Sequence, residues 1–247
     1  MATVADEQHR KQKDWMQRLG TPSAEGTEAV PAATVVLLRD GERGLETLMV
    51  RRNSKLAFAG GMWVFPGGRV DPEDLSADEP GDVLAAARAA AVREAREESD
   101  LVVDAESLVP FAHWVPPPQT PKRFATWFFM GPAPTGAVTV DGGEIRDHRW
   151  LGPAEALTRR DAGEIELAPP TWITLHRLAD HADVAGALAD ATGHEPDFFE
   201  THIARIGDGI AALWEGDAGY ESGDGDAPGP RHRLLMLDEG WRYERSR

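Results

Sequence analysis

Three glutamates stand close together in residues 93–98. On an α-helix, residues i, i+3 and i+4 lie on one face, so Glu94, Glu97 and Glu98 would point in about the same direction. Like charges gathered in this way repel each other and destabilise the helix unless a positive charge neutralises them. Hard divalent cations such as Mg²⁺ prefer carboxylate oxygens as ligands. The three glutamates are therefore candidate metal ligands.

The same pattern also fits an ordinary solvated helix face. Helices rich in Arg and Glu are common, and a pair such as Arg93 with Glu97 at i,i+4 would partly neutralise the acids. The stretch before the helix favours the metal interpretation, because Phe65-Pro66-Gly67-Gly68 predicts a turn in which the backbone can approach a ligand closely. A glycine turn that leads into an acidic helix indicates a metal-bridged phosphate site.

The elements that must position these residues follow from hydrophobic patterning. Residues 33–39 and 45–51 are predicted to form a hairpin around a glycine turn. The alanine-rich residues 80–99 have high helix propensity and predict the helix that carries the glutamates. The aromatic residues 124–130 and the charged residues 144–151 read as further strands. Together they predict a sheet with the acidic helix packed against it.

The order of these features resembles the Nudix box, in which a glycine is followed by a spacer, Arg-Glu, two residues, Glu-Glu and a later apolar residue. Gly68, residues 93–98 and Leu101 match in this order. The resemblance implies an α/β (α+β) fold, the Nudix fold, with a mixed β-sheet sandwiched between helices and with N- and C-terminal extensions. It also implies a metal-dependent pyrophosphohydrolase that cleaves a nucleoside diphosphate linked to another group.

Two positions depart from the box. The glutamate that precedes the arginine falls at Ala85, and the glycine that follows the helix falls at Asp100. Aspartate tolerates the left-handed conformation better than most residues, so the second change is mild. The missing glutamate normally helps to hold the loop and the helix together. We expect an acid of the unusually long spacer, Asp71, Glu73 or Asp74, to take its place.

The resemblance implies a role for several side chains. Glu94, Glu97 and Glu98, with the carbonyl group of Gly68, would hold Mg²⁺ or Mn²⁺. Arg93 would orient the glutamates from outside the metal site. The catalytic candidates are thus Glu94, Glu97 and Arg93, joined by one carboxylate from a different part of the chain.

That carboxylate is Glu144, which follows a predicted Asp141–Gly143 turn. In Nudix proteins a carboxylate near this place reaches the box helix, where it completes the metal site or serves as the base. The alternative is an exposed strand carboxylate beside Arg146.

The substrate class is suggested by further matches. The long spacer, the missing box glutamate and the stretches 116–129 and 167–171 resemble the Nudix subgroup of the peroxisomal coenzyme A diphosphatase. Gly61 with the Phe65–Gly68 motif fits the coenzyme A signature, whereas Ala57 stands where a basic residue is expected. The resemblance implies hydrolysis of coenzyme A or acyl-coenzyme A.

Four basic residues are candidates for binding the substrate's phosphates: Arg51, Arg52, Lys122 and Arg123. Ordinary strand-end charges and structural salt bridges are the alternative for all four. Two other functions stay open. Pro116 stands near a position where ADP-ribose enzymes have proline, which would fit an ADP-ribose or dinucleotide pyrophosphatase. The two departures from the box would fit a catalytically inactive module that binds a nucleotide.

The composition limits the partners. The 247 residues carry a net charge of −16, which argues against a nucleic-acid backbone or an anionic membrane as the main partner. A small nucleotide-type molecule is the expected partner, and a homodimer is left open. Because there is no cysteine, disulfides, thiolate metal sites and cysteine nucleophiles are excluded.

No apolar run is long enough for a membrane span, and no secretory signal is recognisable, so a cytoplasmic location is expected. We expect three regions: an N-terminal helix and linker (1–30), the Nudix hydrolase domain (31–180), and a C-terminal helical extension with a terminal hairpin (181–247). Residues 198–206 fit either a strand or a helix.

Overall fold

The computed structural model describes residues 28–54, 59–77, 79, 81–120, 122–207, 209–237 and 239–246. The predicted N-terminal helix lies outside these residues. The described chain forms two compact units, a larger one of residues 30–113 and 124–197 and a smaller one that contains residues 114–123 and 198–247. The predicted boundaries at 30 and 180 remain predictions.

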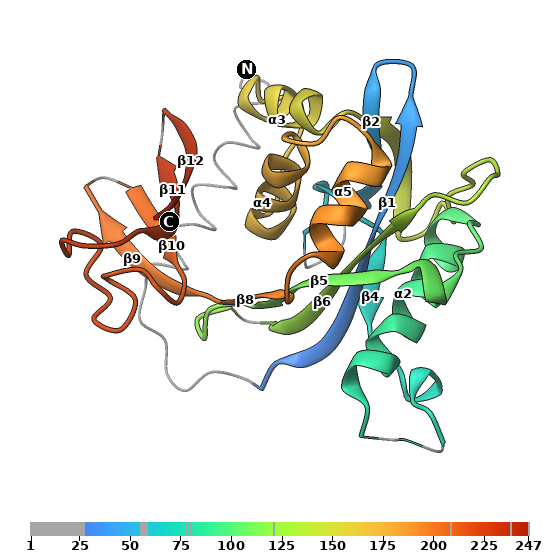
Figure 1. The fold of residues 1–247 in the computed structure, drawn as a ribbon, viewed down its shortest axis with the longest axis horizontal. Helices are drawn as coiled ribbons and strands as arrows, with labels where there is room; N and C mark the ends of the chain where they lie inside the picture. Colours follow the sequence, from blue (N-terminus) through green and yellow to red (C-terminus); the bar gives the residue numbers. More distant parts are fainter. Residues whose placement is uncertain are drawn as a thin grey trace. The chain divides into compact units, whose positions relative to one another are not determined.

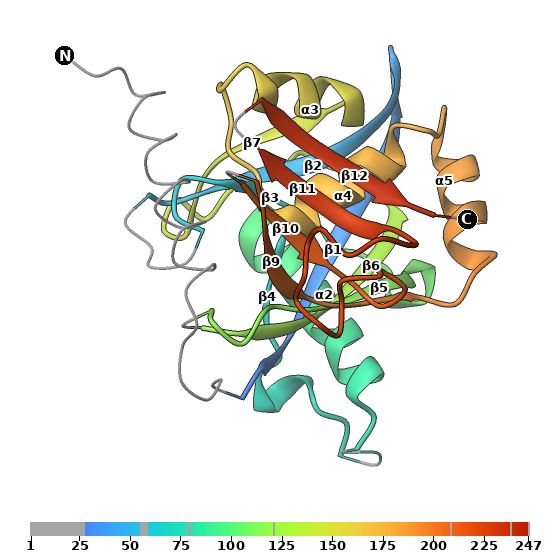
Figure 2. The same ribbon diagram turned by 90° about the vertical axis from the view of Figure 1, so that its left-hand side faces the viewer.

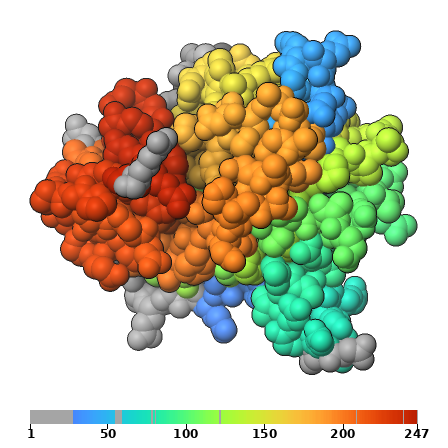
Figure 3. Space-filling view, viewed as in Figure 1, coloured from blue at the N-terminus to red at the C-terminus, as the bar shows by residue number. Residues whose placement is uncertain are grey.

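The larger unit is built on a mixed sheet with the strand order β3-β2-β1-β6-β5. Its strands are β1 (Val30–Gly41), β2 (Gly44–Arg52), β3 (Trp63–Val64), β5 (Val109–Val115) and β6 (Phe124–Pro132). Strands β1 and β2 form the predicted antiparallel hairpin, whereas β1 and β6 run parallel. Two further strands, β4 (Gly67–Arg69) and β7 (Ile145–Leu151), pair antiparallel with β1 and β2. The tip of the β1–β2 hairpin lies at the surface (Figure 3).

Helix α2 (Val83–Ser99) packs on one side of this sheet, and α4 (Pro169–Leu178) and α5 (Val184–Thr192) lie on the other (Figure 1). Helix α3 (Pro153–Asp161) packs against α4 and β2. The small side chains of α2 allow close approach to the sheet: Ala87, Ala90 and Ala91 are fully buried in the core beneath it. The expected mixed sheet between helices is therefore confirmed.

Two short 3₁₀ helices flank α2. One is η1 (Pro72–Asp74) in the spacer before the helix, and the other is η2 (Ala105–Ser107) after it. Helix α2 begins later than its sequence predicts, because the Asp82 side chain caps it by accepting the N–H of Ala85. None of the helices in the described part of the chain has the length and apolar character needed to cross a lipid bilayer.

The smaller unit contains an antiparallel sheet of four strands in the order β12-β11-β10-β9, whose neighbouring strands are seen in Figure 2. These are β9 (His202–Ile206), β10 (Gly209–Leu213), β11 (His232–Leu237) and β12 (Gly240–Arg245). The predicted terminal hairpin is confirmed by β11 and β12. Residues 198–206 contain the end of β8 (Asp197–Glu200) and β9, so strand is the correct alternative there.

Candidate active site

The glycine turn brings its backbone directly against the box helix. Strand β4 pairs with β1 so that Gly67 lies opposite Thr34 and Gly68 opposite Ala33. A Cβ atom on Gly68 would overlap with the carboxylate of Glu94, and one on Gly67 would overlap with the Ala33 carbonyl oxygen. Gly67 therefore needs glycine, because the backbone that it meets cannot move aside, whereas a side chain at position 68 would push the carboxylate of Glu94 away from the turn.

Glu98 is buried beside this turn. Its Oε2 accepts a hydrogen bond from the Gly67 N–H at 3.0 Å, and its Oε1 lies 3.8 Å from the Arg52 guanidinium. Burial raises the pKa of Glu98 to about 8, and the nearby carboxylates of Glu94 and Glu144 add to the rise, while Gly67 and Arg52 oppose it. The carboxylates are thus near enough to repel one another.

The pKa of Glu94 is also raised, by a smaller amount. Burial raises its pKa, as do the negative charges of Glu97 and Glu144, whereas the hydrogen bond from Arg93 lowers it. Glu97, in contrast, is largely exposed and is contacted by Arg93 at 3.1 Å. The helix therefore presents two partly or fully buried acids and one at the surface.

Arg93 holds the box helix, the turn and the spacer together. It donates to Glu94 at 2.8 Å, to the carbonyl oxygen of Arg69 at 3.0 Å and to both carboxylate oxygens of Asp74 at 2.9 and 3.1 Å. The Asp74 side chain is only 5 % exposed and also accepts the N–H of Asp71. The hydrogen bonds to carboxylates raise the pKa of Arg93, and the bond to Asp74 contributes most.

Asp74 is therefore the spacer acid that replaces the carboxylate missing at Ala85. Of the alternatives, Glu73 is exposed, and Asp71 lies 3.9 Å from Arg93 and pairs more closely with Arg69 at 2.7 Å.

Glu144 is held at the end of a turn that other residues build. The Asp141 carboxylate accepts hydrogen bonds from the N–H groups of Gly143, Glu144 and Ile145 at 2.8–3.0 Å. Burial alone would raise the pKa of Asp141, but these bonds outweigh it and lower the pKa. Asn53 clamps the same turn by donating to the carbonyl oxygens of Gly143 and Glu144 at 2.9 and 2.7 Å.

The Glu144 side chain is half exposed and ion-pairs with Arg52. Glu144 is thus linked to Glu98 of the box helix through Arg52, which pairs with both carboxylates. Its role as metal ligand or base remains a proposal.

The predicted phosphate-binding residues lie in different places. Arg51 is exposed on β2, and Arg52 points instead at the acids Glu98 and Glu144. Lys122 and Arg123 belong to the smaller unit, where Arg123 donates to the Pro116 carbonyl oxygen. Substrate binding by these four residues remains a prediction.

Two residues that hold the Glu144 turn, Asn53 and Asp141, were not predicted from the sequence as part of the site. Asn53 gave no signal, because a single polar residue after a strand is common. Asp141 stood in the recognised turn, and an aspartate before two glycines is a known signal for a side chain that caps its own turn. Its importance for Glu144 could have been read from that pattern.

The donors suit a hard cation, although in the described residues no group of three or more acidic or histidine side chains is arranged to hold a metal ion. Arginines hold the carboxylates instead: Arg93 pairs with Glu94 and Glu97, and Arg52 pairs with Glu98 and Glu144. Burial is the main cause of the raised pKa values of Glu94 and Glu98, and the neighbouring carboxylates add to the rise. A divalent cation would stabilise the ionised form of these acids, and carboxylate oxygens are the ligands that such a cation prefers, so these residues suit a divalent metal ion.

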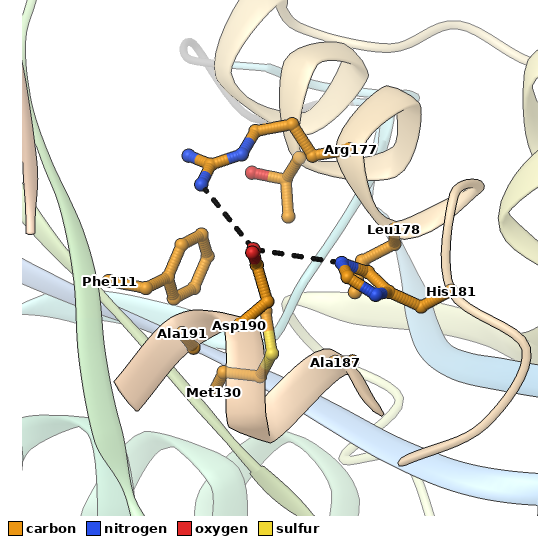
Figure 4. Close-up of a pocket in the computed structure, with 9 residues that line it drawn as sticks. Phe111, Met130, Arg177, Leu178, His181, Ala187, Asp190 and Ala191 are labelled. Carbon is orange, nitrogen blue, oxygen red and sulfur yellow. Dashed lines mark ion pairs between the residues drawn. The ribbon is translucent and has the colours of Figure 1, made fainter. Parts of the chain in front are cut away.

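A small pocket lies elsewhere, on the side of the sheet covered by α4 and α5 (Figure 4). Its polar centre is Asp190, whose carboxylate lies 3.9 Å from Arg177 and 3.7 Å from His181. None of the predicted site residues lines it.

Comparison with known proteins adds the family. A model of the NUDIX domain matches residues 29–171. The crystal structure of a NUDIX hydrolase from Alicyclobacillus acidocaldarius is 25 % identical, with a TM-score of 0.57 over 66 % of this chain and 96 % of that one.

Two other solved structures are more distant. The NUDIX domain of Shewanella oneidensis NrtR, in complex with ADP ribose, is 15 % identical, with a TM-score of 0.48 over 62 % of this chain and 88 % of that one. A MutT NUDIX hydrolase from Burkholderia pseudomallei is 19 % identical, with a TM-score of 0.46 over 61 % and 98 %. No curated protein matches the chain.

The family model covers more than half of the chain, and its range contains the glycine turn, the box helix and the Glu144 turn. The chain therefore belongs to the Nudix family and is a pyrophosphohydrolase that acts on nucleoside diphosphate derivatives with the help of divalent metal ions.

Proposed function

We propose that this enzyme cleaves the diphosphate bond of coenzyme A or an acyl-coenzyme A, giving phosphopantetheine (or its acyl form) and adenosine 3′,5′-bisphosphate. One observation carries the proposal: the glutamates of the box helix lie against the Gly67–Gly68 turn even though the box glutamate is replaced by Ala85. The spacer acid Asp74 restores the missing anchor through Arg93. The long spacer that supplies Asp74 is a feature by which the sequence resembles the coenzyme A subgroup.

Glu94, Glu97 and Glu98, with the Gly68 carbonyl group, are our proposed ligands of Mg²⁺ or Mn²⁺. When bound, such a cation neutralises the diphosphate and acidifies a water molecule. Arg93 holds Glu94 and Glu97 in place from outside.

The chemistry is the addition of water to one phosphorus of the diphosphate. As the new P–O bond forms, the bond to the bridging oxygen breaks, and the electron pair leaves with that oxygen as a phosphate. The water's proton passes to a carboxylate, for which Glu144 is our candidate. Its half-exposed side chain, beside the repelling acids Glu94 and Glu98, has the accessibility that a base needs.

The test is a substrate screen with Mg²⁺ and Mn²⁺, in which the products are identified by mass. We expect coenzyme A to be split into the two products named above. If coenzyme A is untouched and ADP-ribose or a dinucleotide is cleaved, the alternative suggested by Pro116 is correct. If no nucleotide is cleaved although one binds, the module is inactive. The cytoplasmic location and the homodimer also remain proposals, the latter testable by sedimentation.

The metal ligands are tested by Glu97→Gln and Glu98→Gln, which keep the shape of the side chain and remove a charge. Each should lower turnover by about 10²-fold or more without loss of folding, because fewer charges repel on the helix face. Glu106→Gln, at an exposed acid beyond the helix, is the control and should keep wild-type turnover. Wild-type turnover of either box variant would refute the metal assignment.

A further inference from the structure

Arg52 lies between two carboxylates that come from separate parts of the fold. Its Nη1 is 3.8 Å from Glu98 on the box helix, and its Nη2 donates to Glu144 at the end of the 141–144 turn. The side chain of Arg52 is only 16 % exposed, so water screens these ion pairs weakly. Arg52 is thus the counter-ion of two acids at once.

The backbone of β2 is shaped to direct Arg52 there. The pairing of β2 with β7 shifts register between Arg51 and Arg52, as in a β-bulge, a feature that re-aims side chains. Arg51, the preceding residue, is exposed, whereas Arg52 points inward.

Both acids are fixed independently of Arg52. The Gly67 N–H holds Glu98, and the Asp141 and Asn53 side chains hold the turn that carries Glu144. Arg52 therefore neutralises the acids more than it builds their positions.

The guanidinium also has unused donor capacity. The buried Nε of Arg52 has no hydrogen-bond partner among the residues that the structure describes. A buried N–H donor without a partner is unfavourable, and an anion with oxygen acceptors would satisfy it. The planar fork of arginine suits a phosphate oxygen pair in particular.

We propose that Arg52 is an exchangeable counter-ion: it neutralises Glu98 and Glu144 until a divalent cation takes their charge, and its guanidinium then binds the diphosphate of the substrate. This inference rests on the proposed metal site. The cation has to displace the attraction of a positive charge, so metal binding alone is weakened by Arg52. In return, the freed guanidinium strengthens binding of the substrate. Binding of the cation therefore raises the affinity of the site for the substrate.

The test measures Mn²⁺ binding to the full chain without substrate, by calorimetry. Arg52→Gln should bind Mn²⁺ about tenfold more tightly or better, because the cation meets uncompensated carboxylates and no opposing charge. At saturating Mn²⁺, the same variant should bind ADP, which carries a diphosphate, about tenfold more weakly. Opposite effects on the two ligands are the signature of an exchange.

The matched control is Arg146→Gln, which removes the same charge from an exposed position two residues after Glu144. Both affinities should then change by less than about twofold, as expected for screened surface charges. Arg52→Lys keeps the charge but cannot reach both acids with one fork, so its two affinities should lie between those of the wild type and of Arg52→Gln. It remains informative if Arg52→Gln does not fold.

Each outcome decides the question. Unchanged or weaker Mn²⁺ binding in Arg52→Gln, or in Arg52→Lys if only that variant folds, overturns the exchange, since Arg52 would then support the ligands. Unchanged ADP binding overturns the proposal that the freed guanidinium of Arg52 binds the diphosphate. A wild-type protein that binds no Mn²⁺ refutes the proposed metal site itself, and a wild type that binds Mn²⁺ with no effect of Arg52 refutes this inference alone.

Discussion

At the scale of single residues, the site depends on arginines that each serve several carboxylates. Arg93 contacts Asp74, Glu94 and Glu97, and Arg52 contacts Glu98 and Glu144. Such shared partners make the acids interdependent, because removal of one leaves an arginine partly unpaired and its other partners less well held. The first prediction tests this dependence at Asp74.

The first prediction concerns Asp74, which we expect to be the anchor of Arg93. Asp74→Asn should lower the free energy of unfolding by about 1.5–3 kcal/mol, the usual range for hydrogen bonds to a charged group. It should also lower kcat by about 10-fold or more, since Arg93 would hold Glu94 less firmly. Denaturant melts and steady-state kinetics measure both. Glu73→Gln, in the same 3₁₀ turn but exposed, is the control; equal effects of the two variants would contradict the anchor role.

The second prediction concerns Glu144. As ligand or base, Glu144→Gln should lower kcat strongly with little change in stability, because its contribution appears in the transition state. As a surface charge, it would change the free energy of unfolding by no more than about 0.5 kcal/mol and leave kcat intact. Kinetics at saturating Mg²⁺ separate the two. Full kcat would remove Glu144 from the site and leave catalysis to the box glutamates or to an acid of the spacer.

At the scale of elements, the end of the box helix explains why a missing glycine is tolerated. Asp100 ends α2 with φ 60° and ψ 20°, the left-handed conformation, and its N–H donates to the Arg96 carbonyl oxygen at 2.9 Å. Glycine adopts this conformation without cost, aspartate at small cost, and β-branched residues at large cost. The departure from the box at position 100 therefore preserves the helix cap.

A third prediction follows for this cap. Asp100→Gly should stabilise the protein by up to about 1 kcal/mol, and Asp100→Val should destabilise it by about 1–2 kcal/mol. Thermal unfolding measures both. Glu106→Val is the control, an exposed acid close by whose φ is not positive. If valine costs as much at 106 as at 100, the left-handed conformation is not the cause.

At the scale of the whole molecule, the smaller unit contains a buried ion pair of its own. In that unit Asp217 and Arg233 form an ion pair of 2.6 Å whose side chains are essentially inaccessible to water. Arg233 also donates to the Gly225 carbonyl oxygen, and Asp217 accepts the N–H groups of Gly219 and His232. Burial opposes the charge on Asp217, but these bonds outweigh it, so its pKa is lowered.

The fourth prediction is a pH dependence of this unit. Because the folded pKa of Asp217 is below its unfolded value near 3.9, the unfolded state binds more protons in acid, and stability rises with pH. The contribution is complete above about pH 5 and is lost as the pH falls below 4 through the folded pKa.

Asp217→Asn measures this contribution. At pH 7 it should cost about 3–5 kcal/mol, because it leaves Arg233 buried without its partner charge. The difference from the wild type should shrink as the pH falls below 4. Glu221→Gln, an exposed acid of the same unit, should match the wild type at both pH values. A cost for Asp217→Asn that is independent of pH would show that packing and not charge is responsible.

The sequence by itself determined the family, the box helix and the glycine turn, because their signals are local. Glutamates at i, i+3 and i+4 share a helix face wherever the helix lies, and glycine tolerates close approach whatever approaches it. The β1–β2 hairpin and the terminal hairpin are local in the same sense, since each joins neighbouring strands through a short turn.

Only the tertiary structure decided which acid replaces the one missing at Ala85 and what Arg52 contacts. Asp71, Glu73 and Asp74 are equivalent as sequence, but the 3₁₀ turn buries only Asp74 against Arg93. Arg52 meets Glu144 across a sequence separation of 92 residues. That contact depends on the register of β2 with β7 and on its bulge, and register comes from the packing of the whole sheet, which no local pattern encodes.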